Sequence, residues 1–176
     1  MKKLSGIIVL LFILTASIEA QGLAIGPQVG FIKSKSADKN TVMPGAALRV
    51  SLLGLTGEAS VYYKSEELEG GKIKATSYPV MLTAMISLLP IVHLEAGIGY
   101  YTTKVEYSGA YSGFPSNTSK DTGYHLGAGV ELPLGSLVLT GDIRYIFLSM
   151  NLNSNTNLSS VSSDYYAIMV GALFKL

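Results

Sequence analysis

The stretch that decides the fold is YHLGAGVELP, residues 124–133. Apolar or aromatic residues occupy every second position, and polar residues or glycines occupy the positions between them. The first row is Tyr124, Leu126, Ala128 and Val130, and the second is His125, Gly127, Gly129 and Glu131. Side chains alternate between the two faces of a β-strand, so this period of two predicts a strand with one apolar and one polar face.

The same alternation recurs in seven further segments. Together the eight predicted strands cover about 22–34, 42–53, 57–65, 74–88, 92–104, 122–132, 137–150 and 164–176. One row of alternate positions is free of charge in every segment. The opposite row is rich in glycine and carries the polar and ionisable residues, which are Gln28, Arg49, Glu58, Lys64, His93, Glu95, His125, Glu131, Asp142, Arg144 and Lys175.

Composition narrows the fold class further. The chain is 48% hydrophobic, yet after residue 20 it has no apolar run long enough to cross a bilayer as a helix. Bilayers admit only helices and closed barrels, because unpaired backbone groups in hydrocarbon are costly. We therefore predict an all-β domain over 21–176, an eight-stranded antiparallel transmembrane β-barrel with its uncharged row toward lipid. The alternative is a soluble lipocalin-like barrel, which would place the apolar row inside.

The connections alternate in length, which is an independent signal. Short connections are expected at 54–56, 89–91 and 133–136, and long polar ones at 35–41, 66–72, 106–121 and 151–163. Outer-membrane barrels have short periplasmic turns and longer external loops. Aromatic residues near the long loops predict a girdle at the membrane interface, formed by Tyr63, Tyr78, Tyr100, Tyr124, Tyr145, Phe147 and Tyr166.

Residues 1–20 have the pattern of a cleavable signal peptide. Lys2 and Lys3 precede an apolar stretch over 6–18, and Ala20 supplies a small residue for cleavage. Removal of this segment leaves equal numbers of acidic and basic residues, so the mature chain has no net charge to attract nucleic acid. The chain has no cysteine, which excludes disulfides, thiol metal sites and a lipoprotein anchor.

The chain resembles the small OmpX/OmpA-type outer-membrane β-barrel proteins. The residues that carry the resemblance are 124–133, the stretch GDIRY at 141–145, and the terminal 170–176. The resemblance implies location in the bacterial outer membrane, with lipid and lipopolysaccharide as neighbours. It also implies that the barrel-assembly machinery reads the C-terminal strand through Phe174 and Leu176. Many functions share this scaffold, so the resemblance is specific for architecture only.

An eight-stranded barrel is just wide enough for its own side chains to fill it. Charges removed from water must be paired. We therefore predict that Arg49, Glu58, Glu95, Asp142 and Arg144 form a structural hydrogen-bonded network in the lumen, with Glu131 and Lys175 near the periplasmic mouth. The inward glycines should make room for these long side chains: Gly26, Gly30, Gly97, Gly99, Gly127, Gly129 and Gly171. The alternative is a gated ion path.

The predicted function is an integral outer-membrane barrel with an ion-pair-filled lumen. Its role would be non-enzymatic, in envelope structure or in surface interaction through loops 106–121 and 151–163, where a surface ligand could bind. The alternatives are a narrow channel for small solutes and, less favoured, a lipid-modifying enzyme. His93 with Glu95 has the spacing of a base and its orienting group, with Ser87 as a weak nucleophile, whereas His125 has no acid nearby in sequence. We assign no catalytic residue, metal or cofactor.

Overall fold

The computed structural model describes residues 22–34, 41–68, 72–109, 112–113, 115–150, 161–162 and 164–176, so the predicted signal peptide lies outside the described residues. The strands are β1 (Leu23–Ser34), β2 (Thr41–Leu52), β3 (Leu55–Tyr62), β4 (Lys64–Leu68), β5 (Ile73–Leu89), β6 (Val92–Tyr107), β7 (Asn117–Leu134), β8 (Leu137–Met150), β9 (Val161–Ser162) and β10 (Tyr165–Lys175).

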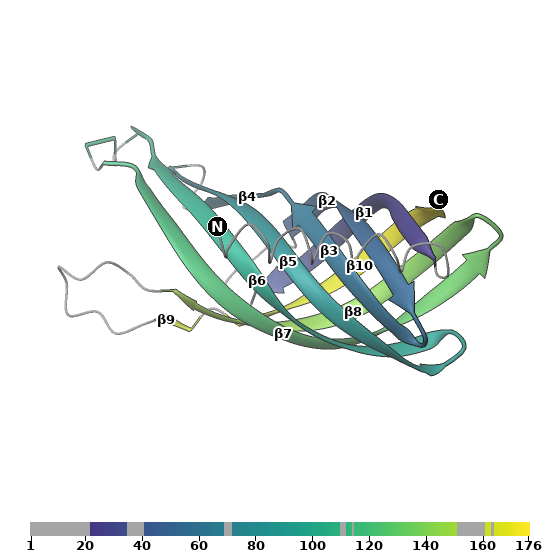
Figure 1. The fold of residues 1–176 in the computed structure, drawn as a ribbon. Coiled ribbons are helices and arrows are strands. Elements are labelled where there is room, and N and C mark those ends of the chain that lie inside the picture. Colours follow the sequence, from purple (N-terminus) through teal and green to yellow (C-terminus); the bar gives the residue numbers. More distant parts are fainter. Residues whose placement is uncertain are drawn as a thin grey trace, which may run out of the picture.

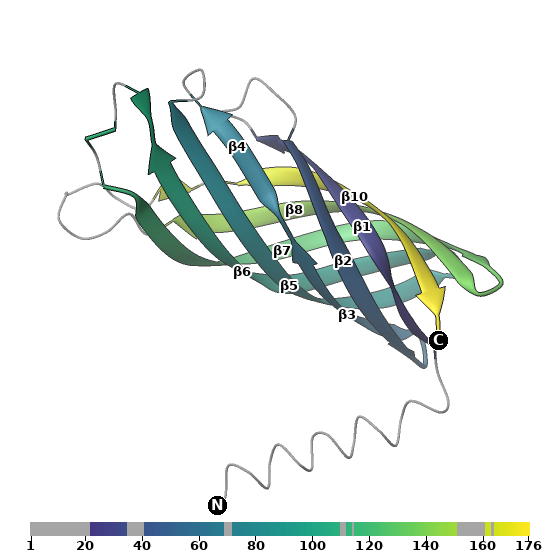
Figure 2. The same cartoon turned by 90° about the horizontal axis from the view of Figure 1, so that it is seen from above.

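These elements make one closed, eight-stranded antiparallel barrel, as the sequence predicts (Figures 1 and 2). β3 and β4 both pair with β5 and are one barrel strand interrupted at Tyr63. β9 has two residues and pairs with β8 ahead of β10. The last strand, β10, pairs with β1 on one side and with β8 on the other, which closes the sheet on itself.

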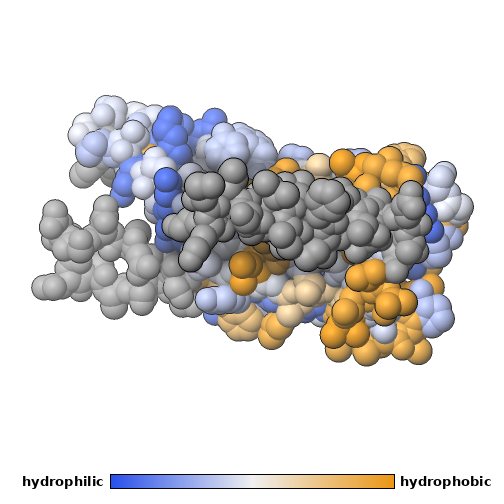
Figure 3. Space-filling model, in the orientation of Figure 1, coloured by the Kyte–Doolittle hydropathy of each residue, from blue (hydrophilic) through white to orange (hydrophobic). Residues whose placement is uncertain are grey.

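The two faces of the sheet carry the predicted side chains. In β3 exposed and buried residues alternate at every position. Leu82, Ile143 and Val170 are each more than half exposed on the outside, whereas Arg49, Glu95 and Arg144 are buried inside. Figure 3 shows the outer apolar surface gathered toward the end that holds the short turns, while the opposite end is hydrophilic. Among the described residues no helix is long and apolar enough to span a membrane.

The aromatic girdle is present on the outer surface. The rings of Tyr63 and Tyr78 lie 5.6 Å apart, and Tyr145 packs edge-on against Phe147 at 4.6 Å and against Tyr166 at 4.7 Å between ring centroids. Tyrosine suits the boundary between hydrocarbon and headgroups, because its ring is apolar and its hydroxyl group is polar.

The three turns are shorter than the sequence suggests. The loop residues are Leu53–Gly54, Pro90–Ile91 and Gly135–Ser136, because the flanking residues already pair across each hairpin. The turn expected at 54–56 is therefore wrong by a residue or two. Leu53 and Gly54 both have positive φ, 49° and 83°, as a two-residue type I′ hairpin requires. A leucine gives no sequence signal for this conformation. We call this end of the barrel the turn end and the opposite end the loop end.

The inner row differs from the prediction in the half of the barrel nearer the loop end. There it is apolar and aromatic, and it forms a buried cluster of Ile32, Met43, Tyr62, Met81, Tyr101, Ile146, Leu148, Tyr165, Ala167 and Met169, which we call the apolar plug. A smaller apolar cluster, Ala24, Ala47, Val138 and Leu173, lies near the turn end. The charged residues of the predicted network lie between these two levels, whereas Lys64, Glu66 and Asp121 lie beside the apolar plug or on its loop side. A period-two pattern separates the faces of a strand but does not require the inner face to be polar along its whole length.

The strained turn residue leads to a stability prediction. Replacement Leu53→Asn should raise the free energy of unfolding by up to about 1 kcal/mol, because asparagine adopts positive φ at lower cost than leucine. Urea unfolding of the barrel in phospholipid vesicles measures the effect. Leu52→Asn is the control, since Leu52 lies in β2 and faces outward. Equal responses of the two variants would contradict the turn assignment.

Candidate functional site

The candidate site is a layer of ionised side chains across the lumen. It consists of Arg49, Glu58, Glu95, Glu131, Asp142 and Arg144, together with His93 and Gln28, and we call it the charged layer. Apart from Glu131, whose side chain is 31% exposed, every member is buried. The structure thus brings together the five residues of the predicted network.

Arg144 of β8 is the centre of one half of the layer. Its Nε donates to Glu95 Oε1 at 2.9 Å, and its Nη2 donates to Glu95 Oε2 at 3.0 Å and to Glu58 Oε1 at 2.8 Å. The two bonds to Glu95 form the bidentate pairing that suits a guanidinium and a carboxylate. The side chain of Arg144 is completely buried, so its charge depends on these partners for compensation.

Arg49 of β2 organises the other half. Its Nε donates to Glu58 Oε2 at 2.7 Å and its Nη2 donates to Asp142 Oδ2 at 3.0 Å, while its Nη1 bonds Glu131. Glu58 therefore accepts from both arginines, one on each of its oxygens. The sequence predicts that Glu131 lies near the mouth and outside the network. The structure shows that it is a further member of the network, since it bonds Arg49. Lys175, also expected near the mouth, is exposed at the turn end.

Two glycines in the central strand of this wall explain the local geometry. Gly129 of β7 lies between His93 of β6 and Asp142 of β8, and Gly127 lies between Glu95 and Arg144 in the same strand order. A side chain at Gly129 would overlap Asp142 Oδ1 and lie 2.6 Å from His93 Nε2. The missing side chains on β7 therefore let residues of β6 reach across to β8. This agrees with the prediction that the inward glycines make room for longer side chains.

Both histidines are buried and hydrogen-bonded, but with partners that the sequence did not indicate. His93 Nε2 lies 2.9 Å from Asp142 Oδ1, and His125 Nε2 lies 2.9 Å from Thr83 Oγ1. Glu95 is held by Arg144, so it does not orient His93 as the spacing suggested. Ser87 is exposed at the turn end. His93, Glu95 and Asp142 do bring three metal-ligating atoms close together. The sequence does not predict this group, because Asp142 lies far from the other two residues along the chain.

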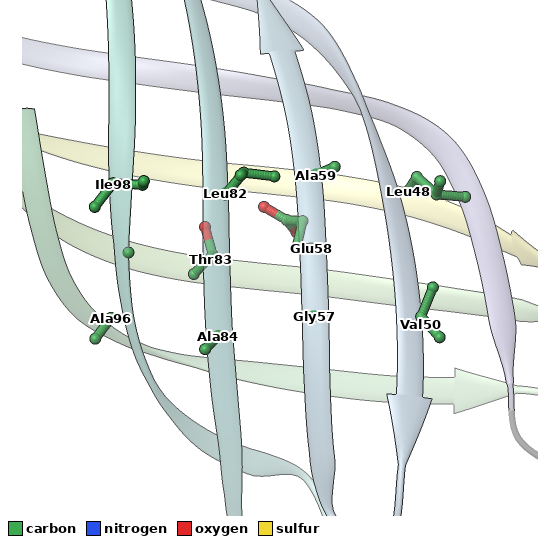
Figure 4. A pocket seen from close by; sticks show the side chains of 11 residues that line it. Leu48, Val50, Gly57, Glu58, Ala59, Leu82, Thr83, Ala84, Ala96 and Ile98 are labelled. Atoms are coloured by element: carbon green, nitrogen blue, oxygen red, sulfur yellow. The ribbon is translucent and has the colours of Figure 1, made fainter. Parts of the chain in front are cut away.

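A separate hollow lies on the outer surface. Small residues Gly57, Ala59, Ala84 and Ala96 leave a shallow depression of about 460 Å³ across β2, β3, β5 and β6 (Figure 4). Its rim is formed by larger side chains, which are Leu48, Val50, Leu82 and Ile98. The hollow belongs to the apolar outer belt and not to the lumen.

Comparison with solved structures identifies the fold. The chain is similar to Neisserial surface protein A, with a TM-score of 0.60, 12% identity, and coverage of 89% of this chain and 97% of the other. It is similar to a major outer-membrane protein of Thermus thermophilus (TM-score 0.63, 15% identity, 89% and 100% covered). It is also similar to Ail, the attachment invasion locus protein of Yersinia pestis (0.56, 15%, 89% and 97%). No family model matches the chain, and no curated protein matches its sequence.

The class of protein follows from the fold and the surface together. A closed antiparallel barrel that is apolar outside and charged inside is built for a lipid bilayer, and the similar structures are outer-membrane proteins. The chain is a small outer-membrane β-barrel. The resemblance to OmpX/OmpA-type barrels is confirmed at the level of the fold, and the soluble lipocalin-like alternative is wrong because the charged side chains point inward.

Loss of a central arginine should be costly. Arg144→Met leaves Glu58 and Glu95 without their shared cation, so we expect the free energy of unfolding to fall by about 3–5 kcal/mol. Urea unfolding in phospholipid vesicles measures it. Lys104→Met is the matched control, because the Lys104–Glu106 pair lies in solvent and should not change stability measurably. Similar behaviour of both variants would mean that the charged layer does not stabilise the barrel.

The glycine positions give a steric prediction. Gly129→Ala should destabilise the barrel by about 1–3 kcal/mol, because the new methyl group displaces the side chains of His93 and Asp142. Gly141→Ala is the control in the neighbouring strand, where the nearest atom to an added Cβ is 3.7 Å away. The two midpoints of unfolding should differ clearly, and a neutral Gly129→Ala would show that the cross-strand contacts are loose.

Proposed function

We propose that this protein is a sealed, non-conducting outer-membrane barrel. Its role is non-enzymatic, in envelope structure or in surface interaction through its extracellular loops. The observation that supports this function is the filling of the lumen at two successive levels. The charged layer crosses the turn half, and the apolar plug lies above it on the side of the loops.

The apolar plug is the stronger barrier to ions. Met43, Met81, Met169 and Ile146 are completely buried and come from four different strands around the lumen. An ion that entered this level would lose its hydration among apolar side chains, with only the tyrosine hydroxyls of the plug to replace it, and hydrophobic constrictions of this kind exclude ions. Below the plug, a moving ion would also have to separate Arg144 from Glu58 and Glu95. These two barriers favour the sealed barrel over the narrow channel.

The contacts of the histidines support a non-enzymatic role. A nucleophilic mechanism needs a base within hydrogen-bond reach of a nucleophile or a bound water molecule. His93 contacts the carboxylate of Asp142, which is not the hydroxyl or thiol that a base activates, and the Thr83 hydroxyl that His125 contacts is itself buried inside the wall. Both histidine side chains are at most 3% exposed, so a lipid substrate outside the barrel does not reach them.

The loop end is the surface for interaction. β5, β6 and β7 continue beyond the girdle residue Tyr78, and pairs such as Lys74 with Glu106 extend the sheet there. Rigid scaffolds commonly carry their functional residues on such ends. We propose contacts with lipid and lipopolysaccharide along the wall, and a surface ligand at 106–121 and 151–163, of which the second lies largely outside the described residues. Ail is an example of this fold in complex with a heparin analogue, sucrose octasulfate.

The C-terminal strand fits recognition by the barrel-assembly machinery. Phe174 and Leu176 point away from the lumen and are 53% and 79% exposed. The Leu176 amide donates to the Leu23 carbonyl at 2.9 Å, so the end of the chain takes part in closing the barrel. We propose that the machinery binds the C-terminal strand before the barrel closes, and that this strand then pairs with β1 to complete the wall.

Planar-bilayer recording tests the sealed lumen. The purified barrel should show no steady conductance, because both levels of the lumen are filled. A variant with Met43, Met81 and Met169 all replaced by alanine should show brief openings, since it removes the three methionine side chains of the plug and leaves the charged layer in place. A steady open pore in the natural protein would overturn the proposed function and favour the channel.

A further inference from the structure

Three metal-ligating side chains converge inside the turn half of the barrel. His93 and Glu95 come from β6 and Asp142 comes from β8, and each can offer one atom so that all three atoms lie within 4.8 Å of one another. The three residues are 3%, 4% and 1% exposed. They are brought together across β7 by the absence of side chains at Gly127 and Gly129, so their approach depends on the wall itself.

The charges of the layer are not balanced. With the imidazole of His93 uncharged, as a metal ligand has to be, the buried groups Glu58, Glu95 and Asp142 supply three carboxylates against the two guanidinium groups of Arg49 and Arg144, and Glu131, which is partly exposed, supplies a fourth. Buried charge without a counter-charge is costly. The described residues of this layer therefore carry an excess of negative charge, one charge from the buried groups and a second from Glu131, which favours a cation. This is a feature of the whole layer and is independent of the spacing of the three ligands.

The hydrogen bonds leave suitable lone pairs for such an ion. Asp142 uses Oδ2 for Arg49 and directs Oδ1 to His93. Glu95 accepts one bond from Arg144 on each oxygen, and each carboxylate oxygen has a second lone pair. Ligand atoms on a tetrahedral Zn²⁺ with bonds of about 2.0–2.1 Å lie about 3.3 Å apart. His93 Nε2 and Asp142 Oδ1 are 2.9 Å apart, so the ion would replace the proton between them, which is released, and would widen this contact slightly. The ligand atoms that lie farther apart, within 4.8 Å, would have to approach one another.

We infer that His93, Glu95 and Asp142 form a binding site for a divalent transition-metal ion in the lumen, with Zn²⁺ as the representative ion. A mixed set of imidazole and carboxylate ligands suits Zn²⁺ and similar ions, whereas Ca²⁺ and Mg²⁺ favour oxygen ligands. The ion reaches the layer from the turn end beside Glu131, which is partly exposed and bonds Arg49, so the smaller apolar cluster does not close this side completely. It ties β6 to β8 across β7, which makes the site structural. This inference is independent of the proposed function.

The test measures zinc directly on the full barrel, purified without a histidine tag and freed of metal by a chelator. Equilibrium dialysis against Zn²⁺ followed by elemental analysis should give one ion per barrel. His93→Gln should lower the affinity at least about tenfold, because loss of a direct ligand should cost no less than the loss of an outer partner. His125→Gln is the matched control: the chain has only two histidines, and His125 contacts Thr83 outside the site.

Two further measurements keep the inference open to refutation. Each variant is first checked on a denaturing gel with and without boiling, because a folded barrel and an unfolded chain migrate differently. If His93→Gln does not fold, Glu95→Gln replaces it, since this change keeps the shape and one oxygen for Arg144. Zinc should also raise the unfolding midpoint of the natural protein and of His125→Gln. No bound zinc in the natural barrel, or equal binding by folded His93→Gln or Glu95→Gln, would overturn the site.

Discussion

The structure depends on the closure of the sheet between its first and last strands. β10 pairs with both β1 and β8, so no strand edge is left exposed along the wall. In hydrocarbon no water can pair with an open edge, and this makes closure a condition for crossing the bilayer. Closure in turn places every second side chain inside. With eight strands the interior has little room for water, so these side chains must satisfy one another.

The charged layer is best understood as a device that fixes register. Buried ion pairs are not reliably stabilising, because desolvation can cancel their attraction. Their effect on the alternatives is larger: a slip of one residue turns the whole inner row of a strand toward lipid. For β8 such a slip would expose Asp142 and Arg144 to hydrocarbon, and an arginine at the midplane costs about 2–4 kcal/mol. Glu58 bridges both arginines, so a shift of β3 would disturb Arg49 and Arg144 together.

The sequence was sufficient to predict the architecture, because the outer face of a membrane barrel has to be apolar wherever it meets hydrocarbon. The uncharged row identified which residues face lipid, and the charged row then identified Arg49, Glu58, Glu95, Asp142 and Arg144 as neighbours inside. The partners of His93 could not be predicted, because the register between β6, β7 and β8 decides which residue it meets. The inner face is also less constrained than the outer one. An inner position that is shielded from water can hold an apolar residue such as methionine, or a glutamate whose counter-charge lies beside it.

The apolar plug and the charged layer are physically linked. Tyr101 belongs to the plug, and its chain neighbour Tyr100 belongs to the outer girdle, so the plug lies at the level where the barrel leaves the hydrocarbon. At this level it separates external water from the ion pairs below. With water excluded, the attraction between Arg144 and its carboxylates is stronger, and the cost of separating them is greater. The plug therefore makes the ion pairs of the charged layer harder to separate, and this strengthens the effect of the layer on the register of β2, β3, β6 and β8.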